Sequence, residues 1–461
     1  MTPPDVTAAV ENVADLDAEK RRGRRRYRRV GLAALGNSLF RVVSTVGSIV
    51  TVPLIVRGSG SDAYGLLAVV TTLATLLAFA DLGIGSGLVT ELAKADGTGD
   101  EQVARELIAS AAVVLMTVGV ALAGVATVMV TLVPWAEVLR VPQPLAGQAT
   151  ASVAVFAVCF VLGVPASLAQ RVHLGLQEGL QASLWLLVGA ALAICTTLLC
   201  VALHTTVPWF VAAAVGSTTL ANALNCLYLF GRRPALRPRL RDVHRVKIAR
   251  LSRTGALFFV LVTAGALAYQ TDALIISVIL GTSAVSEYSL TLRLFSLPLL
   301  AMTFILAPLW PAYSEALSRG DMRWTASTLR RSMKVSLALV VPSSVALVLF
   351  GPRILHLWVG NAVNPPSALW WALAGWIVLN ALTQPLAMLC NGAGVVRMQV
   401  ISALAMTVIN LGLSIALTIH LGVVGPVLGS LVAAFLCSLL PYAVTVRRLL
   451  RDMHQSTAVT N

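Results

Sequence analysis

The chain contains twelve apolar runs, each long enough to cross a lipid bilayer as a helix. About 20 apolar residues span the hydrocarbon core of a membrane. The runs lie near residues 30–56, 64–92, 104–133, 149–171, 180–203, 207–230, 254–280, 286–312, 334–358, 367–391, 398–420 and 424–446. Hydrophobic residues make up 57% of the 461 positions and charged residues 12%, against roughly 25% charged in a soluble domain. We therefore predict an all-α polytopic membrane protein of twelve transmembrane helices, with no soluble domain left over.

The distribution of basic residues predicts how these spans are oriented. Of the 34 Lys and Arg residues, Arg57, Arg140 and Arg353 lie in loops on one side, and Arg41 and Arg293 lie within spans. All the others lie in tails and loops on the opposite side, which the positive-inside rule assigns to the cytoplasm. We expect a multi-pass protein of the cytoplasmic membrane with both termini inside. Because the net charge of +14 follows the membrane in this way, it does not indicate a nucleic-acid partner.

A long basic segment divides the chain into two halves of six spans each. The predicted units are a cytoplasmic tail at 1–29, an N-terminal lobe at 30–230, a basic cytoplasmic linker at 231–253, a C-terminal lobe at 254–446 and a second tail at 447–461. Six spans return the chain to its starting side, so the two lobes can be parallel copies about an axis normal to the membrane. Tyr64 and Glu91 match Tyr288 and Glu315 at one common offset, which supports a parallel pseudo-two-fold repeat.

The N-terminal tail is acidic at first and is predicted to be disordered. It ends in a basic run at 20–29, which we expect to set the topology and to contact anionic lipid headgroups. No cleavage site follows the first apolar run, so the first helix is expected to remain as a signal anchor.

Cysteine and histidine give no sign of a metal site or a cofactor. All six cysteines fall within apolar runs without CxxC spacing, and none of the six histidines has a second ligand at helical spacing. We therefore expect no metal and no cofactor. The loops are too short to house catalysis, and the longest outer loop, near 359–366, has no acidic residue. An integral-membrane glycosyltransferase or ligase is accordingly the least favoured class.

Four ionisable residues stand inside apolar spans, namely Arg41, Asp81, Asp272 and Arg293. A charge at membrane depth is costly and usually marks a pathway or a binding site. Arg41 and Asp81 both lie roughly 16 Å from the inner end of their spans, and Asp272 and Arg293 both lie roughly 10 to 15 Å from the outer end. We therefore predict one ion pair in each lobe. Whether Asp81 and Asp272 only lock helices together or couple transport to an ion stays open.

A polar stripe on the first span predicts where a substrate binds. Asn37, Arg41, Ser44 and Ser48 recur at helical spacing and share one face. An arginine within such a stripe favours a water-filled cavity over simple helix packing. Because the guanidinium fork matches phosphate oxygens and keeps its charge, we predict substrate binding by Asn37, Arg41 and Ser44, and by Arg293 in a similar stripe of the eighth span. Diphosphate is the expected anion.

Two segments carry a resemblance to a known family. Residues 64–100 and 269–321 resemble the polysaccharide and oligosaccharide flippases, of the O-antigen or teichoic-acid type, in the multidrug, oligosaccharidyl-lipid and polysaccharide exporter superfamily. The matching features are a Tyr-Gly pair at 64–65, an Asp-Leu-Gly sequence at 81–83, Asp272, Tyr288 and Pro311. Each motif is weak alone, and their order along twelve spans gives the resemblance its weight.

The resemblance implies a fold, a substrate and a mechanism. It implies two six-helix lobes that face each other in a V, a central cavity lined by spans 1, 2, 7 and 8, and alternating access. The implied substrate is a polyprenyl-diphosphate-linked oligosaccharide moved to the outer leaflet for cell-surface polysaccharide synthesis, with Arg41 matching the cationic cavity residues of the family. Membrane lipids and other polysaccharide-assembly membrane proteins are the implied partners. A multidrug or cation antiporter of the same fold is the main alternative, followed by a purely structural membrane scaffold.

Overall fold

Every predicted span coincides with a helix or a broken helix in the computed structural model. The structure describes residues 32, 35–77, 80–306 and 309–459, and in this part of the chain it contains helices and no strand. The predicted tail at 1–29, with its basic run at 20–29, lies outside the described residues. The protein is thus a polytopic helical membrane protein, as its sequence predicts.

The N-terminal lobe holds the first six spans. Its elements are the first helix (Leu35–Ser59), α2 (Ser61–Leu76), α3 (Ile84–Thr98), α4 (Glu101–Leu132), α5 (Trp135–Val138), a 3-10 turn (Gln143–Leu145), α6 (Ala146–Ala166), α7 (Leu168–Gly175), α8 (Gly179–Ala202), α9 (Val207–Val211), a π turn (Ala212–Gly216) and α10 (Ser217–Arg232). Two 3-10 turns, Pro234–Leu236 and Leu240–Asp242, follow in the linker.

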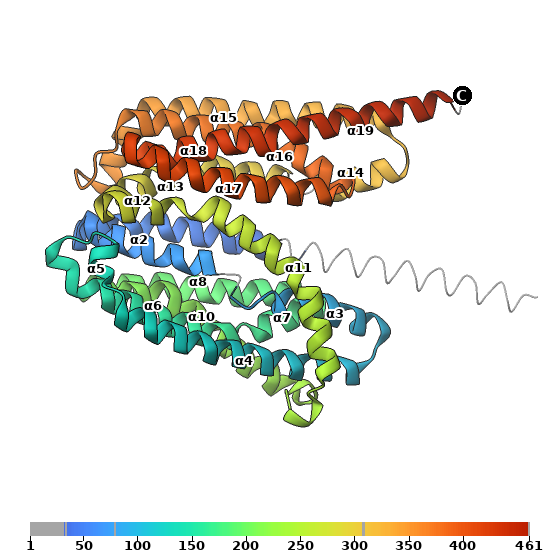
Figure 1. The fold of residues 1–461 in the computed structure, drawn as a ribbon, viewed down its shortest axis with the longest axis horizontal. Coiled ribbons are helices and arrows are strands. Elements are labelled where there is room, and N and C mark those ends of the chain that lie inside the picture. Colours follow the sequence, from blue (N-terminus) through green and yellow to red (C-terminus); the bar gives the residue numbers. More distant parts are fainter. Residues whose placement is uncertain (1–31, 33–34, 78–79, 307–308, 460–461) are drawn as a thin grey trace, which may run out of the picture.

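The C-terminal lobe holds the last six spans. Its helices α12 to α19 form the upper layer of Figure 1, whereas α11 crosses into the lower layer. Its elements are α11 (Arg245–Gln270), α12 (Asp272–Leu280), α13 (Thr282–Leu306), α14 (Leu309–Ser318), α15 (Met322–Val359), α16 (Ser367–Gly392), α17 (Val396–Leu421), a 3-10 turn (Gly422–Val424), α18 (Gly425–Ala434), a π turn (Phe435–Leu439) and α19 (Leu440–Val459). The predicted second tail at 447–461 begins within α19, which extends beyond the rest of the lobe (Figure 1).

Most of the spans are long enough to cross a bilayer in one piece. Nine stretches of the described chain meet this criterion by length and composition, and the last of them, Arg397–Arg451, contains two spans. The two remaining spans are broken near membrane depth, the second between α2 and α3 and the seventh between α11 and α12. The count of twelve agrees with the sequence.

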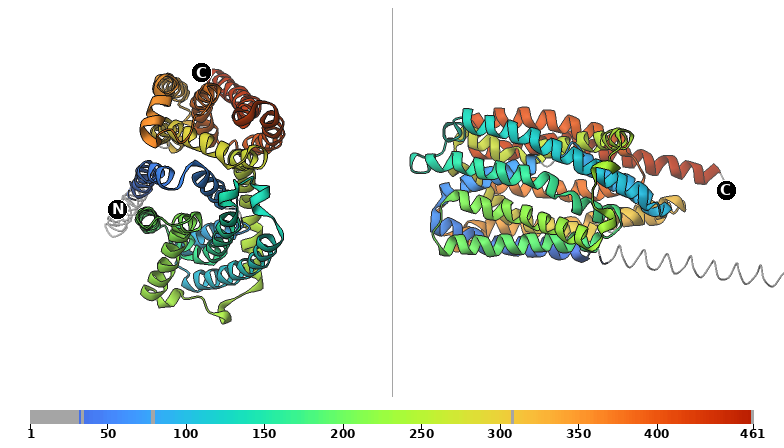
Figure 2. Two further views of the ribbon diagram at one scale, coloured as in Figure 1. Left: turned by 90° about the vertical axis from the view of Figure 1, so that its left-hand side faces the viewer. Right: turned by 90° about the horizontal axis from the view of Figure 1, so that it is seen from below.

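The two lobes repeat each other in their irregularities as well as in their helix order. The sixth span of each lobe contains a π turn. Viewed from its end, the molecule consists of two bundles side by side (Figure 2). These features agree with the predicted parallel repeat.

Polar contacts join the two lobes at the end where α2 begins and α12 ends, which we call the clasp end (left-hand side of Figure 1). Arg57 donates to the carbonyls of Leu357 and Trp358 at 3.0 and 3.2 Å, and the Trp358 indole donates to the carbonyl of Ile49 at 2.7 Å. Further contacts join Ser283 to the Asp62 carboxylate, Ser286 to the Ser61 carbonyl, Ser277 to the Leu139 carbonyl and Arg140 to the Ile279 carbonyl. The lobes are therefore held together at this end.

Helix α11 connects the lobes at the opposite end, which we call the tail end, where α19 and the linker lie (Figure 1). It packs against α3 and α4 of the N-terminal lobe and against α17 of the C-terminal lobe. Glycines make the crossing close, because a side chain on Gly83 would meet the backbone of Gly255 at 2.1 Å. Glu91 is buried and pairs with Lys94 and Arg250, which fixes the start of α11 on α3. The predicted boundary between linker and lobe at 253/254 thus falls inside one helix.

Candidate functional site

A cavity of about 1020 Å³ lies between the lobes. The resemblance implied a lining by spans 1, 2, 7 and 8, and each of these contributes residues. The fourth, fifth and sixth spans contribute as well, through α6, α7, α8 and α10, so the N-terminal lobe supplies most of the wall. The volume is at the upper end of the roughly 300–1,000 Å³ of small-molecule sites. A large polar head group is therefore a suitable occupant.

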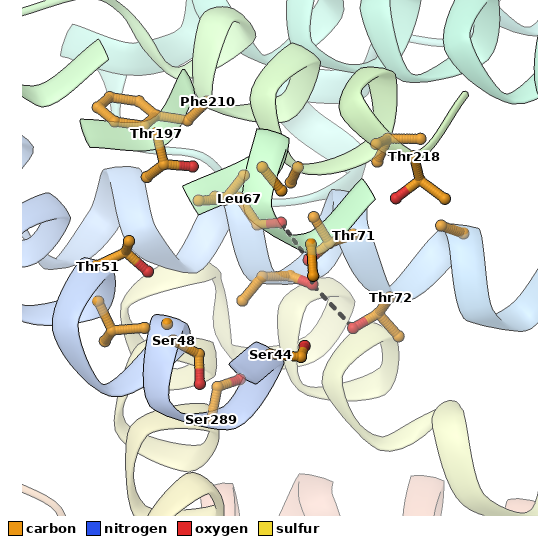
Figure 3. A pocket seen from close by; sticks show the side chains of 18 of the residues that line it. Ser44, Ser48, Thr51, Leu67, Thr71, Thr72, Thr197, Phe210, Thr218 and Ser289 are labelled. Atoms are coloured by element: carbon orange, nitrogen blue, oxygen red, sulfur yellow. Dashed lines mark hydrogen bonds between the residues drawn. The ribbon is translucent and has the colours of Figure 1, made fainter. Parts of the chain in front are cut away.

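The wall of this cavity is rich in hydroxyl groups (Figure 3). Those of the N-terminal lobe come from the first helix, α2, α7, α8 and α10, namely Ser44, Thr45, Ser48, Thr51, Thr71, Thr72, Ser167, Thr197, Thr218 and Thr219. Ser289 and Ser296 of α13 belong to the C-terminal lobe. Thr71 and Thr72 donate to carbonyls of their own helix at 2.8 Å, so their oxygens retain acceptor lone pairs. Ser44, Thr218 and Ser289 have no hydrogen-bond partner among the described residues and can both donate and accept.

Arg293 brings a positive charge into the cavity from the middle of α13, where Ser289 and Ser296 flank it on the same helix face. No carboxylate of the described residues lies within ion-pair distance of Arg293. An unpaired guanidinium at membrane depth is costly unless it faces water or an anion. The predicted binding residues Ser44 and Arg293 both line this cavity.

Asp81 lies in the break between α2 and α3, and its predicted pairing with Arg41 is wrong. Its carboxylate accepts from the backbone amides of Gly83 and Gly85 at 2.9 and 3.3 Å, and Arg171 of α7 lies 3.4 Å away. These bonds satisfy donors that the broken helix leaves without carbonyl partners. Asp81 thus stabilises the start of α3, and its charge is balanced by Arg171.

Asp272 is the first residue of α12, and its predicted pairing with Arg293 is also wrong. The carboxylate is 7% exposed and accepts from the Tyr288 hydroxyl at 3.1 Å, while the Ser430 hydroxyl lies 3.4 Å away. Tyr288 and Arg293 are five residues apart, which places them about 140° apart around α13. Equal depth in the membrane therefore did not bring Asp272 and Arg293 together.

A buried polar cluster continues from Asp272 into α17 and α18. Ser430 lies 3.2 Å from the side-chain oxygen of Asn410, and Ser414 donates to that oxygen at 2.7 Å. The second carboxylate oxygen of Asp272 is buried and has no hydrogen-bond partner among the described residues. The cluster holds an acidic oxygen for which the described part of the chain offers no positive partner.

Asn37 and Arg41 do not line the cavity, contrary to the sequence prediction. Both are exposed and lie on the first helix toward the tail end, beyond Ser44. They share the helix face of Ser44 and Ser48, and Val42 and Val46 on another face are exposed as well. The predicted polar stripe is therefore one face of the first helix. Only the part of this face from Ser44 toward the clasp end lines the cavity.

Arg171 is the charged cavity residue that the sequence analysis did not single out. It is the last residue of the predicted run near 149–171 and is counted with the cytoplasmic side in the sequence analysis. α6 ends at Ala166, one residue after Pro165, and the chain continues at Leu168 as α7. Arg171 of α7 lines the cavity and pairs with Asp81. A proline near the end of a span, followed by an arginine, was the available signal.

Comparison with known families and sequences gives one match. A family model described as "Polysaccharide biosynthesis protein" matches residues 34–317, more than half of the chain. No curated protein matches the chain in sequence.

Solved structures resemble the chain over nearly its whole length. An inward-facing multidrug resistance MATE family transporter of the MOP superfamily has a TM-score of 0.74 and 16% identity, over 91% of this chain and 99% of that one. An outward-facing multidrug resistance MATE family transporter has a TM-score of 0.62 and 14% identity, over 93% and 96%. A MOP superfamily transporter from Pyrococcus furiosus, whose structure is titled for the reverse polarity of its binding pocket, has a TM-score of 0.60 and 14% identity, over 92% and 96%. At these identities the likeness establishes the fold.

The Asp81–Arg171 pair gives a prediction about stability. Arg171→Ala should lower the free energy of unfolding by about 1 to 2 kcal/mol, between the values for exposed and buried pairs, because it leaves the Asp81 charge without a partner. Asp81→Asn in the Arg171→Ala background should restore part of this loss. Thermal unfolding of the purified variants in detergent measures both effects. Arg41→Ala serves as the control, and coupling of Asp81 to Arg41 instead of Arg171 would contradict the assignment.

Proposed function

The chain belongs to the polysaccharide biosynthesis protein family and has the fold of a MOP superfamily transporter, and from this premise we propose that it translocates a lipid-linked oligosaccharide across the cytoplasmic membrane. The proposed substrate is a polyprenyl-diphosphate-linked oligosaccharide. The proposed direction is from the inner to the outer leaflet. The observation that carries the proposal is a large, hydroxyl-lined cavity between the lobes that contains Arg293, for which the described residues offer no ion-pair partner.

Arg293 is the proposed ligand of the diphosphate. The guanidinium offers five N–H donors in a planar fork, which matches phosphate oxygens in a bidentate arrangement. The charge of the other cavity arginine, Arg171, is balanced by Asp81. The positive charge that is available to bind an anion is therefore that of Arg293. Arg41 is one turn beyond Ser44 on the cavity face of the first helix, and we assign it to the rim, where it can meet the head group before it enters.

The hydroxyl wall is the proposed contact for the sugars. Sugar hydroxyls both donate and accept, and so do unpartnered Ser44, Thr218 and Ser289. Neutral hydroxyl groups bind a polar head group without adding charge at membrane depth. The free-energy cost of keeping the empty cavity within the membrane therefore stays low. The polyprenyl chain would stay in the bilayer beside the lobes.

The clasp end is proposed to face outward, because the basic linker and α19 mark the opposite end as cytoplasmic. In this orientation the clasp contacts close the cavity to the outside. Alternating access requires that contacts such as those of Arg57 with Leu357 and Trp358 break when the lobes reorient. A diphosphate diester carries about two negative charges, so an interior-negative potential assists export by more than about 4 kcal/mol per 100 mV.

A multidrug exporter of the same fold remains the alternative, since two of the similar structures are multidrug resistance transporters. A site for cationic drugs calls for an unpaired carboxylate in the cavity. Here Asp81 is paired with Arg171, and Asp272 is only 7% exposed and bonded to Tyr288. Of the two cavity charges without an ion-pair partner among the described residues, that of Arg293 is the more accessible and that of Asp272 is buried, which favours an anionic substrate.

Asp272 is the proposed site of coupling to a cation. It is buried, has no basic partner among the described residues and contacts the hydroxyls of Tyr288 and Ser430, the latter of which also contacts the Asn410 side-chain oxygen. Because a buried carboxylate without a counter-charge is costly, binding of a proton or a small cation would stabilise it. Asp81 is assigned a positioning role instead, since Arg171 and two backbone amides already satisfy it.

Substitution of Arg293 tests the proposed substrate. Arg293→Ala should reduce the affinity for a polyprenyl diphosphate oligosaccharide by about tenfold or more, the effect of losing a charge-assisted bidentate contact. Arg293→Lys should retain part of it, because the charge survives and the fork does not. Binding is measured with fluorescent lipid-linked oligosaccharide and purified protein in detergent. Arg353→Ala, an exposed arginine outside the cavity, is the matched control. Unchanged binding by Arg293→Ala would refute the assignment.

Substitution of Asp272 tests the coupling. In proteoliposomes, Asp272→Asn should abolish the dependence of transport on a proton or sodium gradient while leaving substrate binding intact, because Arg293 is unchanged. Glu315→Gln, which alters an exposed carboxylate paired with Arg319, is the control. Gradient-dependent transport at the wild-type rate by Asp272→Asn would show that the coupling lies elsewhere.

A further inference from the structure

The Arg171–Asp81 pair lines the cavity, and Arg171 has hydrogen-bond donors that the pair does not use. The Arg171 side chain is 33% exposed and Asp81 12%. Only one guanidinium nitrogen contacts the carboxylate, at 3.4 Å, and the other nitrogens have no partner among the described residues. A guanidinium has five N–H donors, so most donors of Arg171 remain available to a ligand in the cavity.

The surroundings of the pair are shaped to hold it in place. Asp81 is fixed by the amides of Gly83 and Gly85 at the start of α3. Gly85 also leaves the room that the pair occupies, because a side chain there would lie 2.5 Å from both the Arg171 Nε atom and the Asp81 carboxylate. The guanidinium is therefore held by a fixed carboxylate while its free edge faces the cavity.

Arg171 and Arg293 lie at different depths. Arg171 is four residues from the last residue of α7, or about 6 Å from the tail end of that span. Arg293 is eleven residues from the start of α13, or about 16 Å from the clasp end. A substrate that enters from the tail end therefore meets the level of Arg171 before it reaches the level of Arg293.

The two arginines also differ in the charge that they present. Asp81 cancels most of the charge of Arg171, whereas Arg293 has no such partner in the part of the chain that the structure describes. An anion is consequently attracted more weakly at Arg171 than at Arg293. An anion that moves from the first to the second moves toward stronger binding.

On the basis of the proposed function, we propose that Arg171 and Asp81 form an entrance subsite for the phosphate groups of the substrate, which Arg171 contacts before they reach Arg293. Asp81 is the positioning residue. It orients Arg171, and its negative charge keeps the affinity of the subsite for an anion low enough that the anion is released toward Arg293. The subsite recognises phosphate, not sugar.

Opposite effects on affinity and transport test this subsite. The probe is a short-chain prenyl diphosphate with a fluorescent group, for binding, and its lipid-linked oligosaccharide counterpart in proteoliposomes, for transport. Asp81→Asn should tighten binding of the probe by about threefold to tenfold, the effect of removing one nearby negative charge at a partly solvated site. The same variant should slow transport, because the anion is retained at the entrance. Arg171→Gln should weaken binding and slow transport.

The controls separate this subsite from a purely structural ion pair. Asn keeps a side-chain oxygen that can accept from Gly83, so the start of α3 retains its cap. Gly85→Ala is a second variant that separates Asp81 and Arg171 without changing any charge, and it should tighten binding in the same direction as Asp81→Asn. Glu315→Gln, which removes a carboxylate of an exposed pair outside the cavity, should change neither quantity.

The outcomes distinguish this inference from the proposed function. If Arg293→Ala loses binding while Asp81→Asn and Arg171→Gln leave it unchanged, or weaken it together, the entrance subsite is refuted and the transport proposal stands. If neither Arg293→Ala nor Arg171→Gln affects binding of the diphosphate, the proposed function itself fails.

Discussion

A bilayer supplies no hydrogen-bond partners, and this constraint governs both the fold and the site. Backbone groups at membrane depth have to be satisfied within the protein, so each span is helical, and each break needs a substitute partner. The break after α2 has one in Asp81, which accepts from the amides of Gly83 and Gly85. A charge that satisfies the backbone needs a counter-charge of its own, and Arg171 provides it. The position of one structural ion pair thus follows from one broken helix.

The same constraint makes a charge without an ion-pair partner costly at membrane depth, so such a charge indicates a functional role. Arg293 faces the cavity without a carboxylate partner in the described part of the chain, and Asp272 lies buried among hydroxyl and amide groups without a basic one. Asp272 lies on α12 and bonds to Tyr288, which lies about 140° from Arg293 around α13. In the proposed function, this arrangement leaves a positive charge for an anionic substrate and a negative charge for a cation. The two halves of a coupled transport cycle would then occupy different faces of one lobe.

The sequence predicted the fold well because the membrane spans follow directly from the positions and lengths of the apolar runs along the chain. Apolar length defines the spans, and each of the twelve predicted runs coincides with a helix or a broken helix in the structure. Contacts between spans depend on the rotation of each helix about its axis, which apolar length leaves undetermined. The pairings of Arg41 with Asp81 and of Asp272 with Arg293 were inferred from depth alone, and both were wrong for this reason. Arg171 was missed because its position at the end of a predicted run does not show which face of the helix it occupies.

We propose above all that the cavity moves an anionic lipid-linked oligosaccharide outward. The most direct measurement is the appearance of labelled polyprenyl-diphosphate oligosaccharide on the outer face of proteoliposomes that contain the purified protein, under an imposed interior-negative potential. We expect protein-dependent translocation that becomes faster as the potential grows, because the substrate carries about two negative charges. Translocation no faster than in protein-free vesicles, together with export of cationic drugs by the same vesicles, would contradict it.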